Sequence, residues 1–267
     1  GPLFISADQT ATFNEDFTIP FDATLLYVFP HMHLIGKSIR SWGNLPITDD
    51  TVRFIDIPDW DFHWQDNFIF PNTIRAPFGI TLQAEAFYDN TTNNEHNPSS
   101  PTEDVSAGEG TYDEMMFVFF AYMNYEAGDE DIIVDSRIIP KGATNVCQGE
   151  SVLLTTIEGV GYTYQWYLDN VPITNATNAT FEATEIGDYT VEISLGPNTI
   201  MSDPAPISIN SAYNISETVP VCENTVYAYP DGYSETIIGN TSHTSILTSV
   251  AGCDSVIVTN INLAPNY

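Results

Sequence analysis

Basic residues are scarce in this chain of 267 residues. Six Lys and Arg stand against 36 Asp and Glu, and the formal net charge is −30. A surface of this sign repels phosphates and anionic lipids, so neither a nucleic acid nor a membrane surface is expected as a partner. Apolar runs of about eighteen residues are also lacking, which predicts no membrane insertion. The opening residues Gly1-Pro2-Leu3 do not begin a signal peptide, so we expect a cleaved or missing N-terminus.

The basic residues that do occur all lie before residue 142. At this point, in IIPKGATNVCQGE, the composition changes, and Pro140 and Gly142 mark a boundary. A hydrophobic content of 43% is enough to form a sizeable core. Together with the motifs below, these features predict an all-β chain in three parts, 1–141, 142–211 and 212–267.

His31 and His33 lie two residues apart in LLYVFPHMHLI, a run rich in β-forming residues. Side chains at positions i and i+2 of a strand share one face, so both imidazoles are expected on one side of a sheet. Such a pair supplies two ligands of a metal site. The alternative is that both histidines belong to a buried strand and are satisfied by hydrogen bonds.

Met115 lies in TYDEMMFVFFAYMNYEAG, a second strand-like run about eighty residues further along the chain. Taken alone, this methionine would belong to the core. Together with two imidazoles, a thioether favours copper over zinc or calcium, and Cu(I) in particular. The three side chains therefore form a candidate copper site.

Four ordered segments in residues 10–135 resemble the C-terminal domain of the copper type II, ascorbate-dependent monooxygenases, the family of the peptidylglycine and dopamine hydroxylases. They are the two runs above, WDFHWQDNFIF and LQAEAFYDNTTNNEHNP. The resemblance implies a jelly-roll-like β-sandwich in which His31, His33 and Met115 hold the copper that activates oxygen for attack on a substrate C–H bond. Ascorbate would be the external reductant. A second family copper, bound by three histidines in a separate N-terminal half, has no counterpart here, so we expect an upstream three-histidine module or a chain that is nearly inactive alone.

Three phenylalanines indicate the kind of substrate. Phe29, Phe117 and Phe119 stand where the peptide-hydroxylating members of that family carry an arginine, an asparagine and a tyrosine that grip a carboxylate. Aromatic rings cannot make such charge-assisted bonds. We therefore expect a small apolar or aromatic substrate and not a peptidylglycine. The alternative is that Phe117 and Phe119 alternate on one strand as core residues.

Residues 143 to about 210 alternate apolar and polar positions in short runs separated by turns, which predicts a β-sandwich. Trp166 resembles the buried tryptophan of strand C in the immunoglobulin-like fold, and the resemblance implies an immunoglobulin-like domain over 142–211. Tyr189 resembles its tyrosine corner. Val191 stands where antibody domains carry the second cysteine, so an apolar contact is expected there in place of a disulfide.

Residues 212–267 resemble a repeat found in large secreted surface proteins of Bacteroidetes. The resemblance implies a small β-module in which Cys222 and Cys253 pair, with a gain of about 3 kcal/mol. Cys147 is then left as a free thiol or as an intermolecular link. A disulfide and strong acidity together indicate a secreted or cell-surface location.

The remaining candidate residues are not expected to form a functional site. His63 and His96 lack ligand spacing to the histidine pair, and His243 is expected to be structural. The run Asp129-Glu130-Asp131 lacks the alternating oxygens of a calcium loop and predicts a solvated acidic turn. Sequons permit N-glycosylation only in a host with that machinery; they occur at Asn90, Asn175, Asn178, Asn214 and Asn240.

Two functions from different classes follow from these observations. The first is the oxygen-activating copper half of a secreted monooxygenase. The second is a structural or adhesive multi-module protein of a cell surface or filament, in which the copper site is retained or vestigial and the partners are further surface-protein modules.

Overall fold

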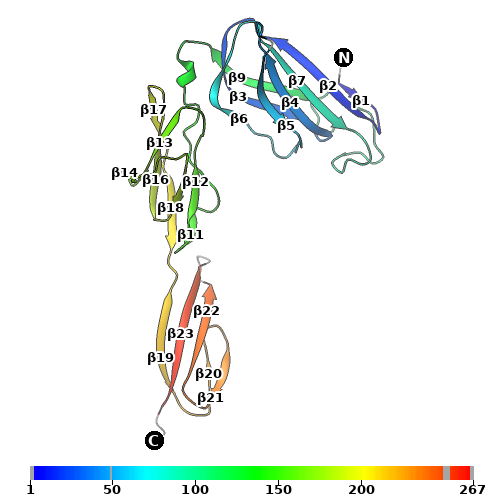
Figure 1. The fold of residues 1–267 in the computed structure, drawn as a ribbon. Coiled ribbons are helices and arrows are strands. Elements are labelled where there is room, and N and C mark those ends of the chain that lie inside the picture. Colours follow the sequence, from blue (N-terminus) through cyan, green and yellow to red (C-terminus); the bar gives the residue numbers. More distant parts are fainter. Residues whose placement is uncertain (1–2, 49, 249–252, 265–267) are drawn as a thin grey trace. The chain divides into compact units, whose positions relative to one another are not determined.

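The computed structural model describes residues 3–48, 50–248 and 253–264, and the chain is built of β-strands (Figure 1). Within these ranges the one helical element is the short turn η1 (Asp129–Asp131). No helix there is long and apolar enough to cross a membrane. The predicted all-β class is confirmed. By its contacts the chain divides into two compact units, one of residues 1–135, 158–162 and 194–199 and one of residues 136–157, 163–193 and 200–267.

The first unit contains a sandwich of two antiparallel sheets (Figure 1). The larger sheet has the order β2 (Thr10–Thr18), β7 (Thr81–Asp89), β4 (Gly36–Asn44) and β5 (Thr51–Ile57). The smaller sheet has the order β6 (Phe68–Ala76), β3 (Ala23–Met32) and β9 (Met116–Asn124). A separate short pair consists of β1 (Phe4–Ile5) and β8 (Val105–Ser106).

Side-chain alternation along β3 shows which face of the smaller sheet is inside. Val28 and Met32 are fully buried, whereas Phe29 and His31 are only partly buried. Inward side chains from both sheets form two apolar clusters. One contains Ile5, Met32, Ile35, Ile39, Trp60, Ala86, Tyr88 and Val105, and the other contains Ile19, Ala23, Leu25, Val28, Phe54, Phe70, Ala76 and Ile80. Because successive strand residues point to opposite faces, Phe29 and His31 lie on the outer face of the sheet.

Residues 139–210 form two further sheets. The first has the order β10 (Ile139–Pro140), β12 (Val152–Thr155) and β15 (Thr180–Ala183). The second has the order β11 (Asn145–Cys147), β18 (Ala205–Asn210), β16 (Gly187–Leu195), β13 (Tyr162–Leu168) and β14 (Val171–Pro172), with β17 (Asn198–Met201) paired to β16. Trp166 is fully buried, as predicted, and its Nε1 donates to the carbonyl of Asn178 at 2.8 Å.

The predicted tyrosine corner is also present. The Tyr189 hydroxyl donates to the backbone carbonyl of Glu185 at 3.1 Å, which fixes the chain just before β16. Val191, on the same strand, is fully buried, so an apolar side chain fills the position predicted for it.

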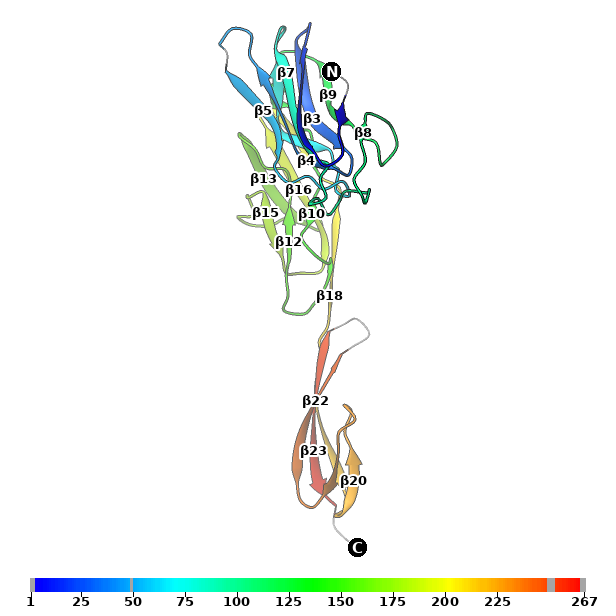
Figure 2. The same cartoon turned by 90° about the vertical axis from the view of Figure 1, so that its right-hand side faces the viewer.

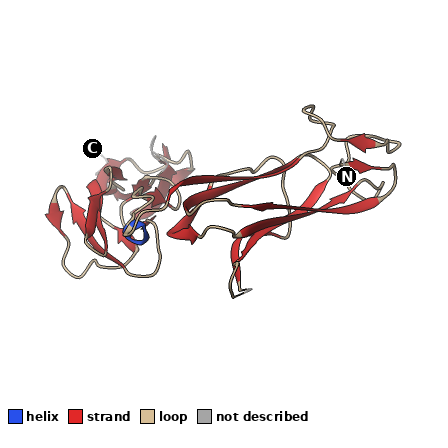
Figure 3. Cartoon of the chain, turned by 90° about the horizontal axis from the view of Figure 1, so that it is seen from above, coloured by secondary structure: helices blue, strands red, loops and turns tan. Residues whose placement is uncertain are grey.

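Residues 214–263 form a parallel pair, β19 (Asn214–Val221) with β23 (Asp254–Leu263), extended by antiparallel β22 (Thr241–Thr248). A hairpin of β20 (Thr225–Ala228) and β21 (Ser234–Ile237) completes the segment (Figure 2). Its small core consists of Val221, Tyr229, Ile237 and Ile261. Figure 3 shows the strands of the chain in red and η1 in blue.

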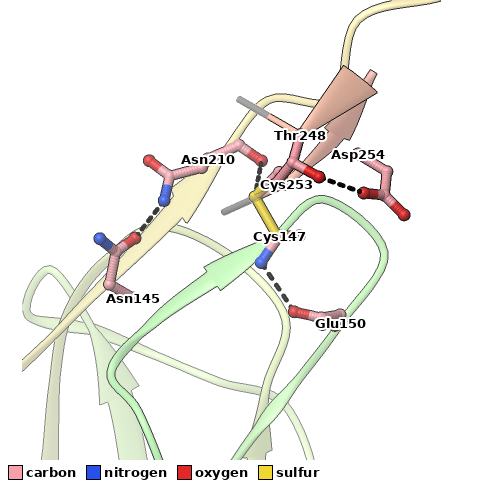
Figure 4. The surroundings of a disulfide bond; sticks show 7 residues. All are labelled: Asn145, Cys147, Glu150, Asn210, Thr248, Cys253 and Asp254. Atoms are coloured by element: carbon pink, nitrogen blue, oxygen red, sulfur yellow. Dashed lines mark hydrogen bonds between the residues drawn. A yellow bond between two sulfur atoms is a disulfide. The ribbon is translucent and has the colours of Figure 1, made fainter. Parts of the chain in front are cut away.

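The disulfide differs from the predicted one. Cys147 at the end of β11 is bonded to Cys253 just before β23, with Cα atoms 5.5 Å apart (Figure 4). The predicted Cys222–Cys253 pair is wrong, because β19 and β23 run parallel and pair Val221 with Leu263. Cys222 and Cys253 therefore lie beyond opposite ends of strands about 30 Å long, whereas disulfide Cα atoms lie within about 7 Å. Cys222 has a free, exposed thiol.

The division into parts 1–141, 142–211 and 212–267 stays a prediction. Each sheet of the described residues lies within one of these parts, except that β10 pairs with β12 across the first boundary. The contacts of the chain separate it into two compact units and not three.

Candidate functional site

The antiparallel pair β3–β9 brings the two predicted ligand segments together. Its register sets His31 opposite Phe117 and Met32 opposite Met116. His33 directly follows β3 and Met115 directly precedes β9, so both lie at the end of this ladder. The two imidazole ring centroids are 5.0 Å apart. The structure therefore places His31 and His33 beside each other, and Met115 at the adjoining strand end.

His33 is buried, with 4% of its surface exposed, and its ring is held in one orientation. Its Nδ1 lies 2.9 Å from the backbone carbonyl oxygen of Asp113. A carbonyl oxygen can only accept, so Nδ1 carries the proton and donates it. The lone pair of the neutral ring is then on Nε2. Phe62 contacts the same ring edge-on, with centroids 5.8 Å apart.

His31 is held in an equivalent way by a side-chain amide. Its Nδ1 lies 2.5 Å from Oε1 of Gln65. The Nε2 of Gln65 donates to the carbonyl of Phe62 at 2.8 Å, which fixes the amide so that its oxygen faces the imidazole. His31 therefore also donates from Nδ1 and carries its lone pair on Nε2. The segment between Trp60 and β6 supplies the contacts to both rings.

A buried carboxylate joins the two ligand segments. Glu114 is 1% exposed and accepts hydrogen bonds from three backbone N–H groups, those of His33 at 3.0 Å, Ile35 at 3.0 Å and Met115 at 3.1 Å. Burial raises the pKa of the Glu114 carboxyl above its ordinary value, while the three N–H donors act in the opposite direction. Its contacts fix the turn after β3 against the start of β9.

Met115 is partly buried and is tied to the core by its backbone. Its carbonyl accepts a hydrogen bond from the Tyr88 hydroxyl at 2.8 Å. Burial, with the nearby charge of Glu114, raises the pKa of that hydroxyl, so it remains a donor. Because Met116 packs into the core, alternation sets the Met115 side chain on the same outer face as His31.

The three predicted wall residues lie together on this outer face. Phe29 and Phe119 are a cross-strand pair with ring centroids 6.2 Å apart, and Phe117 stacks on Phe119 at 5.3 Å. Phe29 also stacks on His31 at 6.2 Å. Phe117 and Phe119 are 45% and 52% exposed, so the alternative that they are core residues is wrong.

The other histidines have different hydrogen-bond partners from the two of this site. His63 is exposed and pairs with Asp61 at 3.2 Å, and His96 lies 4.0 Å from the carboxylate of Glu95. His243 is bound to Asp231 at 2.8 Å and contacts the rings of Tyr229 and Tyr233, in agreement with the structural role predicted for it. Asp129, by contrast, is buried and accepts from the Thr24 hydroxyl at 2.6 Å, so the prediction of a solvated turn is wrong at this residue.

Three supporting residues were not singled out from the sequence. They are Gln65, Asp113 and Glu114, which orient the two imidazoles and join the ligand segments. Their positions inside WDFHWQDNFIF and TYDEMM gave a signal, because both segments belong to the set of motifs that carries the resemblance. Their hydrogen-bond partners are distant in sequence and could not be assigned from it.

The donor set offers two imidazole nitrogens and one thioether sulfur. Among the described residues, no three His, Cys, Asp or Glu side chains are grouped as a metal site. Comparison of the chain with protein-family models and with curated protein sequences finds no match.

Proposed function

We propose that His31, His33 and Met115 bind copper and that this chain is the oxygen-activating half of a secreted monooxygenase. The observation that carries the proposal is the state of the two imidazoles. Both donate from Nδ1 to fixed oxygen acceptors, and neither Nε2 has a hydrogen-bond partner among the described residues. Metal-binding histidines use this arrangement, in which an outer acceptor selects the tautomer and leaves the other nitrogen for the metal.

The donor atoms suit copper in particular. The thioether is a soft ligand, and the two imidazole nitrogens are borderline ligands that copper also accepts; with no carboxylate or thiolate in the set, the sulfur favours Cu(I) over zinc, calcium or magnesium. When bound, copper supplies redox chemistry toward dioxygen at an open coordination position. Gln65 and Asp113 orient the two imidazoles, and Glu114 joins the backbone of His33 to that of Met115.

The aromatic wall of Phe29, Phe117 and Phe119 would hold an apolar part of the substrate beside the ligands. These rings offer apolar surface and no charge to a carboxylate, which supports a C–H bond of an apolar or aromatic molecule as the target. A second copper module with three histidines and ascorbate would supply electrons. Such a module is the partner that this proposal requires.

A structural or adhesive role is the second candidate. The disulfide between Cys147 and Cys253 joins residues 106 positions apart and links the immunoglobulin-like part to the last β-segment. Cross-linking of consecutive β-segments is a feature of secreted multi-module proteins. In that case the copper site would be retained without turnover.

Metal binding by matched variants tests the proposal. We expect one equivalent of copper after reconstitution with Cu(I), and loss of most of it in His31→Ala and His33→Ala. His243→Ala is the control, because His243 lies on β22 in the other compact unit and outside the donor set. X-ray absorption of the Cu(I) form should show a sulfur scatterer that disappears in Met115→Ile.

Two results would contradict the copper proposal. One is absence of copper from the reconstituted wild type, and the other is equal copper content in the double alanine variant. If copper binds, addition of a three-histidine module should produce ascorbate-dependent oxygen uptake. Fibre formation or cell binding by the copper-free chain, without such uptake, would favour the structural candidate.

A further inference from the structure

A trough lies between the edge strands of the two sheets in the first unit. β2 ends the larger sheet and β9 ends the smaller one among the described strands. Two cavities lie along these edges, one of about 440 Å³ and one of about 510 Å³. Both are lined by Glu15, Met116 and Phe117, so the two cavities together are called the trough.

The floor of the trough is the inner face of the sandwich. β2 sets Phe17 opposite Leu82, Glu15 opposite Ala84 and Phe13 opposite Ala86. Directly opposed residues share a face of the sheet, and Leu82 and Ala86 pack in the core. Glu15 and Phe17 therefore face the space between the sheets.

The sandwich is open along this edge. Phe17 is 64% exposed although it faces inward, and Tyr122 at the far end of β9 is 56% exposed. The lining from Met116 to Tyr122 covers six steps of β9, a length of about 20 Å. An extended molecule fits these dimensions better than a single compact ring.

Glu15 is the one charged side chain shared by the two cavities. Glu15 is exposed, and its carboxylate makes no hydrogen bond or ion pair among the described residues. Most residues that line the trough are apolar, and its other charged residues, Asp16, Glu109 and Glu114, are also acidic. A carboxylate in such surroundings is complementary to a cation. The net charge of −30 further opposes an anionic ligand.

The trough borders the candidate copper site along the edge strand β9, and neither His31 nor His33 lines it. Met115 lines the 510 Å³ cavity, and the wall residues Phe117 and Phe119 line the 440 Å³ cavity. A molecule that lay along β9 would therefore pass the Met115 end of the ligand set. Pockets of this volume are typical of small-molecule sites.

We infer that the trough binds an elongated apolar molecule carrying one cationic nitrogen, with the nitrogen at Glu15 and the apolar chain along β9. Its role as the substrate site rests on the copper-dependent function proposed above. Binding itself needs no metal and can be measured without it.

Titration calorimetry on the metal-free full chain tests the inference with three probes of equal length, decylamine, decanol and decanoate, below their aggregation concentrations. We expect saturable binding of one decylamine and at least about tenfold weaker binding of decanoate. Glu15→Gln should weaken decylamine about tenfold and leave decanol unchanged. Glu103→Gln, the same charge change on an exposed residue outside the trough, is the control.

A second pair of variants tests the apolar wall. Phe17→Ala should weaken both decylamine and decanol several-fold, whereas Phe78→Ala should weaken neither, because Phe78 is equally exposed at 65% but lies outside the trough. Failure of decylamine to bind, or equal effects of Glu15→Gln and Glu103→Gln, would overturn the inference. The His31→Ala/His33→Ala chain should still bind decylamine, so loss of copper binding and loss of ligand binding are separate results.

Discussion

The histidine pair differs from the other histidines of this chain in what its rings contact. His243 and His63 face carboxylates, which satisfy and orient them as part of the structure. His31 and His33 face neutral oxygen acceptors through Nδ1 alone. A ring that donates from Nδ1 to a fixed oxygen keeps Nε2 available for a metal, which is the arrangement typical of metal-binding histidines. The hydrogen-bond partners of the rings therefore distinguish His31 and His33 from His63 and His243.

Glu114 is the residue on which the geometry of the site depends most. In Glu114→Gln the amide nitrogen must face one of three N–H donors, so at least one buried hydrogen bond is lost. We expect the free energy of unfolding to fall by about 1–3 kcal/mol and copper affinity to fall with it. Urea unfolding and copper titration measure the two effects. Glu109→Gln, at an exposed neighbouring position, is the control and should change neither the free energy of unfolding nor the copper affinity. If Glu114→Gln also left both quantities unchanged, the carboxylate would not position the ligands.

At the scale of elements, the strands of the candidate site were predictable and its loops were not. The alternation in LLYVFPHMHLI and MFVFFAYMN gave β3 and β9, and with them a shared outer face for His31, Phe117 and Phe119. The loop that carries Gln65 has no such period, because its shape depends on hydrogen bonds to residues distant in sequence. Asp129 shows the same limit, since its burial depends on Thr24, 105 positions earlier.

A contact between two elements contributes to the pH dependence of stability in the last β-segment. Asp231, in the turn between β20 and β21, bonds His243 on β22 at 2.8 Å. The hydrogen bond from His243 holds the pKa of the Asp231 carboxyl below its ordinary value. A depressed carboxyl pKa stabilises the folded state above the unfolded pKa, and this contribution is lost as the pH falls through the folded pKa.

Asp231→Asn should therefore be less stable than the wild type near neutral pH, and the difference should disappear at acidic pH. Urea unfolding across a pH series measures it, and the NMR titration of the Asp231 carboxyl gives the pKa directly. Asp203→Asn, an exposed aspartate of the same unit, is the control. Its stability difference from the wild type should not change in this way with pH. A difference that persisted unchanged into acid would contradict the assigned contact.

At the scale of the whole molecule, the cysteines show why the local sequence pattern was insufficient to predict the disulfide. VC and GCDS lie in one short segment, which favoured a local bridge between Cys222 and Cys253. The parallel arrangement of β19 and β23 separates those two residues by the length of the strands. Parallel register is a non-local property, and the residue that meets Cys253 comes from another sheet, at the end of β11.

The observed bridge has a measurable consequence for stability and for thiol content. It closes a loop of 106 residues, for which chain entropy predicts about 4–5 kcal/mol of stabilisation. Cys147→Ser with Cys253→Ser should lower the free energy of unfolding of the second unit by up to this amount, and Cys222→Ser should leave it unchanged because that thiol is exposed and unbonded. Native protein should react with one equivalent of a thiol reagent and reduced, unfolded protein with three. Peptide mapping that recovered Cys222 joined to Cys253 would contradict the parallel register of β19 and β23, because that register holds these two sulfurs at opposite ends of the strand pair.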